Sequence, residues 1–278
     1  AKYHVEGLGT FGAHVTFFNL GENEARDEFN NPIGTFRSYD LAVGGSYGFK
    51  LSNRLALGTG VRLIYSNLAP GQVVGSQETK AGVSVGVDLS ALYKTGYFKM
   101  GSIDSELSAG LNLNNMGPTI QYSDSDQSDP IPTNLRFGWA YKMQFDQYNS
   151  LTFSNDFTKL LVDRDSTGAK PFYEAIFSSW KSIDVNTGTP DDPNVESLGV
   201  LSQLTVGLGA EYWYNDLFAV RAGYFYENPN NGNREFLTLG AGIRYNIIGV
   251  DFSYLFPFEE NHPLANTIRF SILVGRGA

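Results

Sequence analysis

The sequence contains no cysteine, no cluster of basic residues and no long apolar run, and each absence excludes a class of protein. Without cysteine, the chain has no disulfides, no thiolate metal ligands and no cysteine nucleophile. No segment approaches the ~18 consecutive apolar residues that a membrane-spanning helix requires. The formal net charge is −9, from 20 basic and 29 acidic side chains, so nucleic acid is not expected as a partner.

Apolar residues instead alternate with polar or small residues over many segments. In residues 204–214 the apolar positions are Leu204, Val206, Leu208, Ala210, Tyr212 and Tyr214. Because successive side chains of a strand point to opposite faces, this segment has one apolar and one polar face. Apolar faces rich in tyrosine, phenylalanine and leucine are typical of transmembrane barrels, which are polar inside. Such a chain is compatible with a membrane even at a mean hydropathy of −0.21.

The alternation predicts an all-β fold, a transmembrane antiparallel outer-membrane β-barrel that forms a single domain over residues 1–278. The twelve expected strands are residues 3–20, 37–50, 53–66, 81–95, 103–115, 132–145, 147–160, 199–214, 217–227, 234–247, 248–256 and 265–275. Because the first strand starts almost at Ala1, we expect the N-terminal part of the barrel to be absent from this sequence.

The connections between these strands alternate in length. Tight ones are expected at 51–52, 97–101, 146, 215–216 and 248–249, and long ones at 21–36, 67–80, 116–131, 161–198, 228–233 and 257–264. Bacterial outer-membrane barrels have short periplasmic turns and long extracellular loops. We therefore expect the long connections to be extracellular and the tight turns to be periplasmic.

The same register predicts which side chains face lipid. Leu208 and Ile243 should point to lipid, whereas Glu211 and Arg244 should point inward. The charges expected on the inner face are Arg62, Asp88, Glu106, Arg136, Glu211, Arg221, Arg244, Asp251 and Arg269. Ionisable groups at membrane depth normally face protein or water and pair with each other. They either pair across a plugged interior or line a path for a polar solute.

The long connection 161–198 contains the one expected helix. Helical spacing relates Phe172, Ala175, Ile176, Ser179, Trp180 and Ile183, after Pro171, which suits a first turn. An apolar stripe on an extracellular loop has to be covered, either by the protein's own barrel or by a partner protein. Phe177 lies beside the stripe and broadens it. The candidate partner-binding residues are Phe172, Ile176, Phe177 and Trp180.

Two glycine motifs do not predict an enzyme. Residues 7–12 match the dinucleotide motif G-x-G-x-x-G, but a β-rich segment follows instead of the helix that binds the phosphate. Residues 44–48 and 82–86 match G-x-S-x-G, but both serines lie inside expected strands instead of at a strand-to-helix turn.

The sequence also contains no motif typical of a metal site. The three histidines, His4, His14 and His262, lack metal-ligand spacing. The acidic segment 124–129 lacks the glycine and the distal glutamate of a calcium loop. We therefore expect no catalytic residue, no cofactor and no metal.

Short segments over nearly the whole chain resemble the PorV family. They are residues 209–215, 218–225, 237–243, 251–254 and 261–270, and upstream 18–21, 27–32, 63–66, 115–118, 132–136 and 148–153. The resemblance implies an outer-membrane barrel of the type IX secretion system of Bacteroidota, related in fold to the FadL transporters. The family barrel has fourteen strands, which implies that two strands and a plugging helix precede Ala1.

The resemblance also implies a non-enzymatic shuttle with protein partners. Such a protein binds the C-terminal signal domain of secreted cargo at a SprA-type translocon and carries the cargo to a PorU-type attachment complex. Lipid and lipopolysaccharide of the outer membrane would surround it. Two alternatives stay open: a FadL-type channel for hydrophobic solutes, which needs an apolar interior pocket, and an outer-membrane lipid-modifying hydrolase, which needs a serine–histidine pair.

Overall fold

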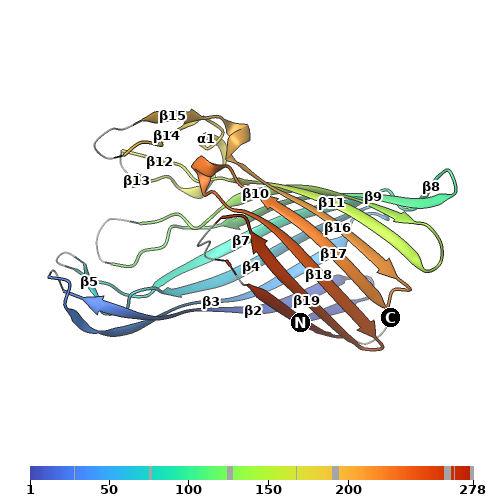
Figure 1. The fold of residues 1–278 in the computed structure, drawn as a ribbon, viewed down its shortest axis with the longest axis horizontal. Helices are drawn as coiled ribbons and strands as arrows, with labels where there is room; N and C mark the ends of the chain where they lie inside the picture. The colour runs from blue at the N-terminus through green and yellow to red at the C-terminus, as the bar shows by residue number, and fades with distance from the viewer. Residues whose placement is uncertain are drawn as a thin grey trace. The chain divides into compact units, whose positions relative to one another are not determined.

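The computed structural model describes residues 1–27, 29–74, 77–123, 128–166, 168–189, 194–259, 264–265 and 267–275. One antiparallel sheet of fourteen strands dominates this part of the chain (Figure 1). Its strands follow chain order, β1-β2-β3-β4-β7-β9-β10-β11-β16-β17-β18-β19-β20, and β8 pairs with β9. The all-β antiparallel fold class predicted from the alternation is therefore confirmed. Within the described residues, no helix has both the length and the apolar character to cross a membrane.

The long strands occupy most of the chain. They are β2 (Gly9–Arg26), β3 (Pro32–Lys50), β4 (Leu55–Asn67), β7 (Gly82–Lys94), β9 (Ile103–Met116), β10 (Asn134–Gln144), β11 (Asn149–Leu160), β16 (Leu204–Tyr214), β17 (Phe218–Tyr226), β18 (Glu235–Tyr245), β19 (Ile248–Pro257) and β20 (Ile268–Val274). The short strands are β1 (Lys2–Val5), β5 (Val73–Val74), β6 (Gln77–Glu78), β8 (Phe98–Met100), β12 (Arg164–Asp165), β13 (Gly168–Ala169), β14 (Ile183–Asn186) and β15 (Val195–Leu198). The helical elements are α1 (Phe172–Ser178) and the 3-10 turns η1 (Val200–Gln203) and η2 (Pro229–Asn231).

Contacts within the chain define two compact units. The first consists of Ala1–Ala91, Asn112–Leu135 and Leu160–Trp180, and the second of Leu92–Leu111, Arg136–Lys159 and Lys181–Ala278. The first unit therefore contains α1 and the β2–β3 hairpin, whereas the second contains strands β16 to β20.

The predicted first strand, residues 3–20, is wrong. The chain instead turns after β1 and pairs it back on β2, with Val5 opposite Gly9. Gly7 has φ +76°, a left-handed conformation that glycine adopts without steric cost. The alternation breaks here, because Leu8 is out of step with Val5 and Phe11, and Gly7 and Gly9 are the sequence signs of this turn.

The connection expected at 21–36 is also largely strand. Strand β2 continues to Arg26 and β3 already starts at Pro32, so only a short turn separates them. The turn expected at 248–249 lies instead at 246–247, where Tyr245 and Ile248 are opposite each other and Asn246 has φ +52°. Asparagine tolerates this conformation better than most residues, and two-residue hairpin loops require it.

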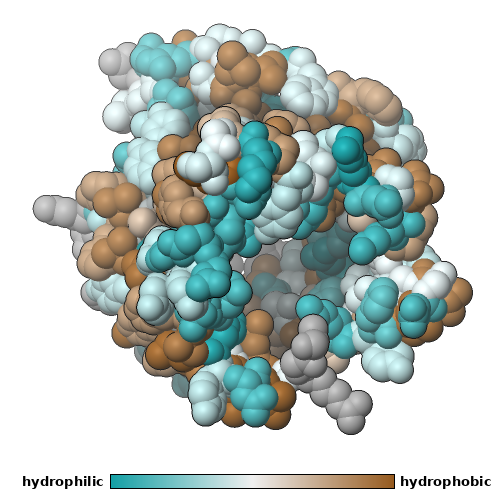
Figure 2. Space-filling model, turned by 90° about the vertical axis from the view of Figure 1, so that its right-hand side faces the viewer, coloured by the Kyte–Doolittle hydropathy of each residue, from teal (hydrophilic) through white to brown (hydrophobic). Residues whose placement is uncertain are grey.

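The strands expose their apolar side chains. In β18, Leu239 is 54% exposed and Ile243 is also 54% exposed, whereas Arg244 on the opposite face is half-buried. In β16, Leu208 is 49% exposed. The outward positions predicted for Leu208 and Ile243 are confirmed, and apolar side chains reach the molecular surface in many places (Figure 2). So much exposed apolar area is unfavourable in water and suits a lipid environment.

Candidate functional site

The predicted helix in connection 161–198 exists, but it is short. Helix α1 follows Pro171, whose carbonyl accepts hydrogen bonds from the backbone of Glu174 (3.0 Å) and Ala175 (2.9 Å). The helix ends at Ser178, and Ile183, expected on the same stripe, begins β14 instead. The predicted stripe is therefore wrong at its C-terminal end.

A buried carboxylate holds the two ends of the helical segment. The side chain of Asp163 accepts hydrogen bonds from Lys170 Nζ and Ser178 Oγ, both at 2.7 Å. The Asp163 side chain is only 6% exposed. The hydrogen bond to Asp163 is the largest cause that raises the pKa of Lys170. These bonds fix the start and the end of α1 on the same anchor, although the sequence pattern did not reveal Asp163.

The candidate partner-binding residues fall into two groups. Phe172 and Ile176 are half-buried, and the neighbouring Ala175 is fully buried, so this side of α1 packs on the protein itself. Phe177 is 80% exposed and Trp180 is 47% exposed. The first pair is therefore partly covered by the protein itself, whereas the second pair lies at the surface.

Tyr173 completes an exposed patch that sequence reasoning missed. It is 58% exposed and lies four residues before Phe177, which in turn lies three residues before Trp180. This spacing brings the Tyr173 and Phe177 rings to one side of α1, and Trp180 follows two residues after the helix ends. The indole N–H of Trp180 donates a hydrogen bond to the carbonyl of Ile176 at 2.9 Å, which fixes the ring beside the last turn. We call Tyr173, Phe177 and Trp180 the aromatic face of α1.

A second exposed region lies at the tip of the β2–β3 hairpin. The Asp27 carboxylate accepts hydrogen bonds from the backbone of Phe29 (2.9 Å) and Asn31 (2.8 Å), and from the Asn31 side chain (3.0 Å). The bond from the Asn31 side chain is the largest cause that lowers the pKa of Asp27. This ordered turn presents Phe29 with 83% of its surface exposed.

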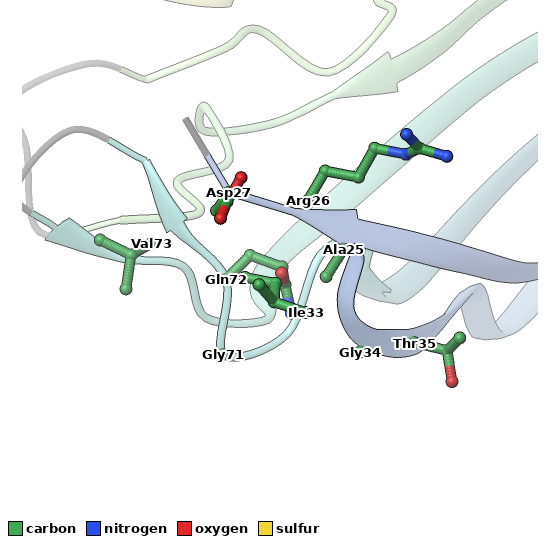
Figure 3. A pocket seen from close by; sticks show the side chains of 9 residues that line it. All are labelled: Ala25, Arg26, Asp27, Ile33, Gly34, Thr35, Gly71, Gln72 and Val73. Atoms are coloured by element: carbon green, nitrogen blue, oxygen red, sulfur yellow. The ribbon is translucent and has the colours of Figure 1, made fainter. Parts of the chain in front are cut away.

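A pocket of about 580 Å³ adjoins this hairpin tip (Figure 3). It is lined by Ala25, Arg26, Asp27, Ile33, Gly34, Thr35, Gly71, Gln72 and Val73. The guanidinium of Arg26 points away from the other labelled side chains and bonds Glu24 (Figure 3). Among the described residues that line it, Asp27 is the one carboxylate, and it is already bonded within its own turn.

The charges on the polar face of the second unit pair with one another. Arg221 Nε lies 2.6 Å from Glu211, and Arg221 Nη1 lies 2.8 Å from Asp251. Arg244 contacts the other oxygen of Asp251 at 2.8 Å. Both guanidinium groups also lie 5.4 Å from the centre of the Trp213 ring. Glu211 and Arg244 thus lie on the face opposite Leu208 and Ile243, as expected, and the charges pair between nearby strands of one sheet instead of across an interior.

The glycine motifs of the sequence and its described histidines lie in strands and turns of the structure. Residues 7–12 form the β1–β2 turn and the start of β2, without a following helix. Ser46 lies within β3, and Ser84 lies within β7 and donates to the carbonyl of Pro118. His4 hydrogen-bonds Thr10. His262 and most of the acidic segment lie outside the described residues, and the described part holds no group of three potential metal ligands.

These features define a class of protein. Long antiparallel strands, in chain order, with exposed apolar side chains on one face and ion-paired polar side chains on the other, are the construction of outer-membrane β-barrel proteins. The family described as "Type IX secretion system protein PorV" matches residues 3–167. Since the match covers more than half of the sequence, the chain belongs to the PorV family of type IX secretion system proteins. Helix α1 lies just beyond the matched residues.

Comparison with curated proteins finds no match. Among solved structures, the chain is similar to the Ralstonia pickettii toluene transporter TbuX, with a TM-score of 0.45 and 16% identity over 92% of this chain and 75% of that one. For the Pseudomonas putida toluene transporter TodX, the TM-score is 0.45 and the identity 13%, over 98% of this chain and 78% of that one. For a Pseudomonas aeruginosa FadL homologue, the TM-score is 0.39 and the identity 14%, over 92% of this chain and 68% of that one.

Proposed function

We propose that this protein binds the C-terminal signal domain of secreted cargo at a SprA-type translocon and carries it to a PorU-type attachment complex. Membership of the PorV family supports a role in type IX secretion. The exposed apolar strand faces support residence in the outer membrane, where the protein can diffuse laterally between the two complexes. In this proposal the long connections are extracellular, and lipid and lipopolysaccharide surround the strands.

The observation that carries the proposal is the aromatic face of α1. Aromatic side chains dominate the binding energy of many protein interfaces, because they bury a large area with few rotatable bonds. Tyr173 and Phe177 are mainly exposed, although the helix beneath them is anchored by Asp163. Exposed rings on this anchored helix are available to a protein partner, and a secretion protein has such partners.

The test is the double substitution Tyr173→Ala and Phe177→Ala. Both side chains are mostly exposed, and alanine favours a helix, so the protein should still assemble. Loss of two aromatic anchors should weaken partner binding by ~2–4 kcal/mol, roughly thirtyfold to a thousandfold. Recovery of the translocon with the purified protein and the amount of secreted cargo should both fall.

Leu201→Ala provides the matched control. Leu201 belongs to η1, which like α1 lies between β11 and β16 in the chain, and it is 82% exposed, but it is not part of the aromatic face. This variant should retain secretion and the translocon. If the double variant is well assembled and still recovers its partners normally, the aromatic face is not the docking surface, and the hairpin tip with Phe29 becomes the next region to test.

A further inference from the structure

A cleft on the polar face of the second unit has more hydrogen-bond donors than the protein satisfies. It has a volume of about 380 Å³. Its lining residues come from β17, β18, β19 and β20: Arg221, Thr238, Leu239, Gly240, Asp251, Phe252, Ser253, Arg269 and Ser271. Gly240, Ser253 and Arg269 are neighbours across three strands, because Ser253 is opposite Gly240 on one side and opposite Arg269 on the other.

The two arginines of this cleft differ in their partners. Arg221 is held by Glu211 and Asp251, and Asp251 also binds Arg244. Arg269 has no ion-pair or hydrogen-bond partner in the part of the chain that the structure describes, and it is exposed. Among the described side chains, these three guanidinium groups and two carboxylates carry an excess of one positive charge, in a chain whose net charge is −9.

Three side-chain hydroxyl groups line the same cleft as Arg269. Thr238, Ser253 and Ser271 line the same cleft, and their hydroxyls make no hydrogen bond with other described residues. A guanidinium offers two parallel N–H groups, and a serine or threonine hydroxyl can donate one further bond. The one carboxylate among the described lining residues, Asp251, is already bonded to Arg221 and Arg244, so a bound anion would supply a further acceptor for these donors.

We propose that this cleft binds a carboxylate group, with the guanidinium of Arg269 as its two-pronged donor and Ser253 and Ser271 as additional donors. The charge favours a carboxylate over a phosphate monoester, since one negative charge balances the single excess positive charge. The carboxylate belongs either to a small organic acid or to the C-terminus of a polypeptide. The proposal does not depend on cargo binding by α1, because all the groups involved belong to the second unit.

The test is a binding titration of the detergent-solubilised protein with N-acetylglycine, monitored by ligand-observed NMR. The dissociation constant should be on the order of 1 mM, as expected for a few bonds to an exposed charge. N-acetylglycinamide, which has the same size without the charge, should not bind measurably. Methylphosphonate should bind more weakly than N-acetylglycine. A short peptide with a free C-terminus is then compared with the same peptide in amidated form. If only the free form binds, the cleft accepts the C-terminus of a polypeptide as well as a small organic acid.

Variants identify the residues responsible. Arg269→Gln should weaken N-acetylglycine binding roughly tenfold to a hundredfold, because a hydrogen bond to a charged group is lost. Arg269→Lys should retain part of the binding, and Ser253→Ala should weaken it less. Arg37→Gln is the control, since Arg37 is 81% exposed and belongs to the first unit. Equal binding of the neutral amide, tighter binding of the phosphonate, or unchanged binding by a folded Arg269→Gln protein would each overturn the proposal.

Discussion

Gly242 determines whether the polar face of the second unit can form its ion-pair network. Arg221 on β17 and Asp251 on β19 are separated by β18, and they meet at 2.8 Å across Gly242. A Cβ atom added to Gly242 would lie 2.8 Å from Arg221 Nη1 and even closer to Asp251 Oδ1. Gly242→Ala should therefore force these two side chains apart.

The expected cost follows from the bonds that remain. Separating a charged hydrogen-bonded pair costs roughly 1.5–3 kcal/mol. Here Asp251 keeps Arg244 and Arg221 keeps Glu211, so neither charge is left without a partner. Replacing glycine inside a strand also recovers roughly 0.5–1 kcal/mol, because alanine loses less conformational entropy on folding. The free energy of unfolding should thus fall by ~1–2 kcal/mol.

Equilibrium unfolding in urea, with the protein in lipid vesicles or detergent, measures this change. Gly207→Ala is the matched control: Gly207 is on the polar side of β16, and a Cβ there would lie 3.9 Å from the Cβ of Asp156, an ordinary contact. The control should be neutral or stabilising. If Gly242→Ala unfolds at the same urea concentration as the control, the network does not contribute to stability as argued.

Three further predictions concern the lipid face, the topology and the hairpin tip. Leu208→Arg, near the bilayer midplane, should lower the free energy of unfolding by ~2–4 kcal/mol. Gly207 is the neighbouring residue on the other face, opposite Asp156 in the register, and Gly207→Arg should lower it much less. Equal costs would contradict the assigned faces. In this cysteine-free chain, a cysteine at Gly188 should react with a membrane-impermeant reagent on intact cells and one at Ser52 should not, and labelling of both would disprove the proposed orientation. The hydrogen bond from the Asn31 side chain is the chief cause that lowers the pKa of Asp27 in the folded protein. The ionised carboxylate should therefore stabilise the turn fully above the pKa of the unfolded chain, and this stabilisation should be lost as the pH falls through the lower pKa of the folded protein. Hydrogen exchange of the turn amides should accelerate over that pH range in the unmodified protein but not in Asp27→Asn.

The exposed aromatic face of α1 was predictable only in part. Helical spacing located α1 and identified Phe177 and Trp180, which are exposed, but it also selected Phe172 and Ile176, which the protein half-buries itself. Spacing shows which side chains share a face, but not whether that face points to the protein or to solvent. The direction of α1 depends on the Asp163 anchor, nine residues before the helix starts.

The sequence by itself determined the fold class and the outward side of strands such as β16 and β18. Both follow from alternation, because a strand's side chains change face at every residue and lipid accepts only apolar ones. Leu208 and Ile243 therefore point outward as expected. Only the tertiary structure decided that the chain turns back at Gly7, that Arg221 reaches Asp251 across Gly242, and that Arg269 is left unpaired among the described residues. These features depend on how separate strands are paired and in which register, and alternation within one strand carries no information about its neighbours.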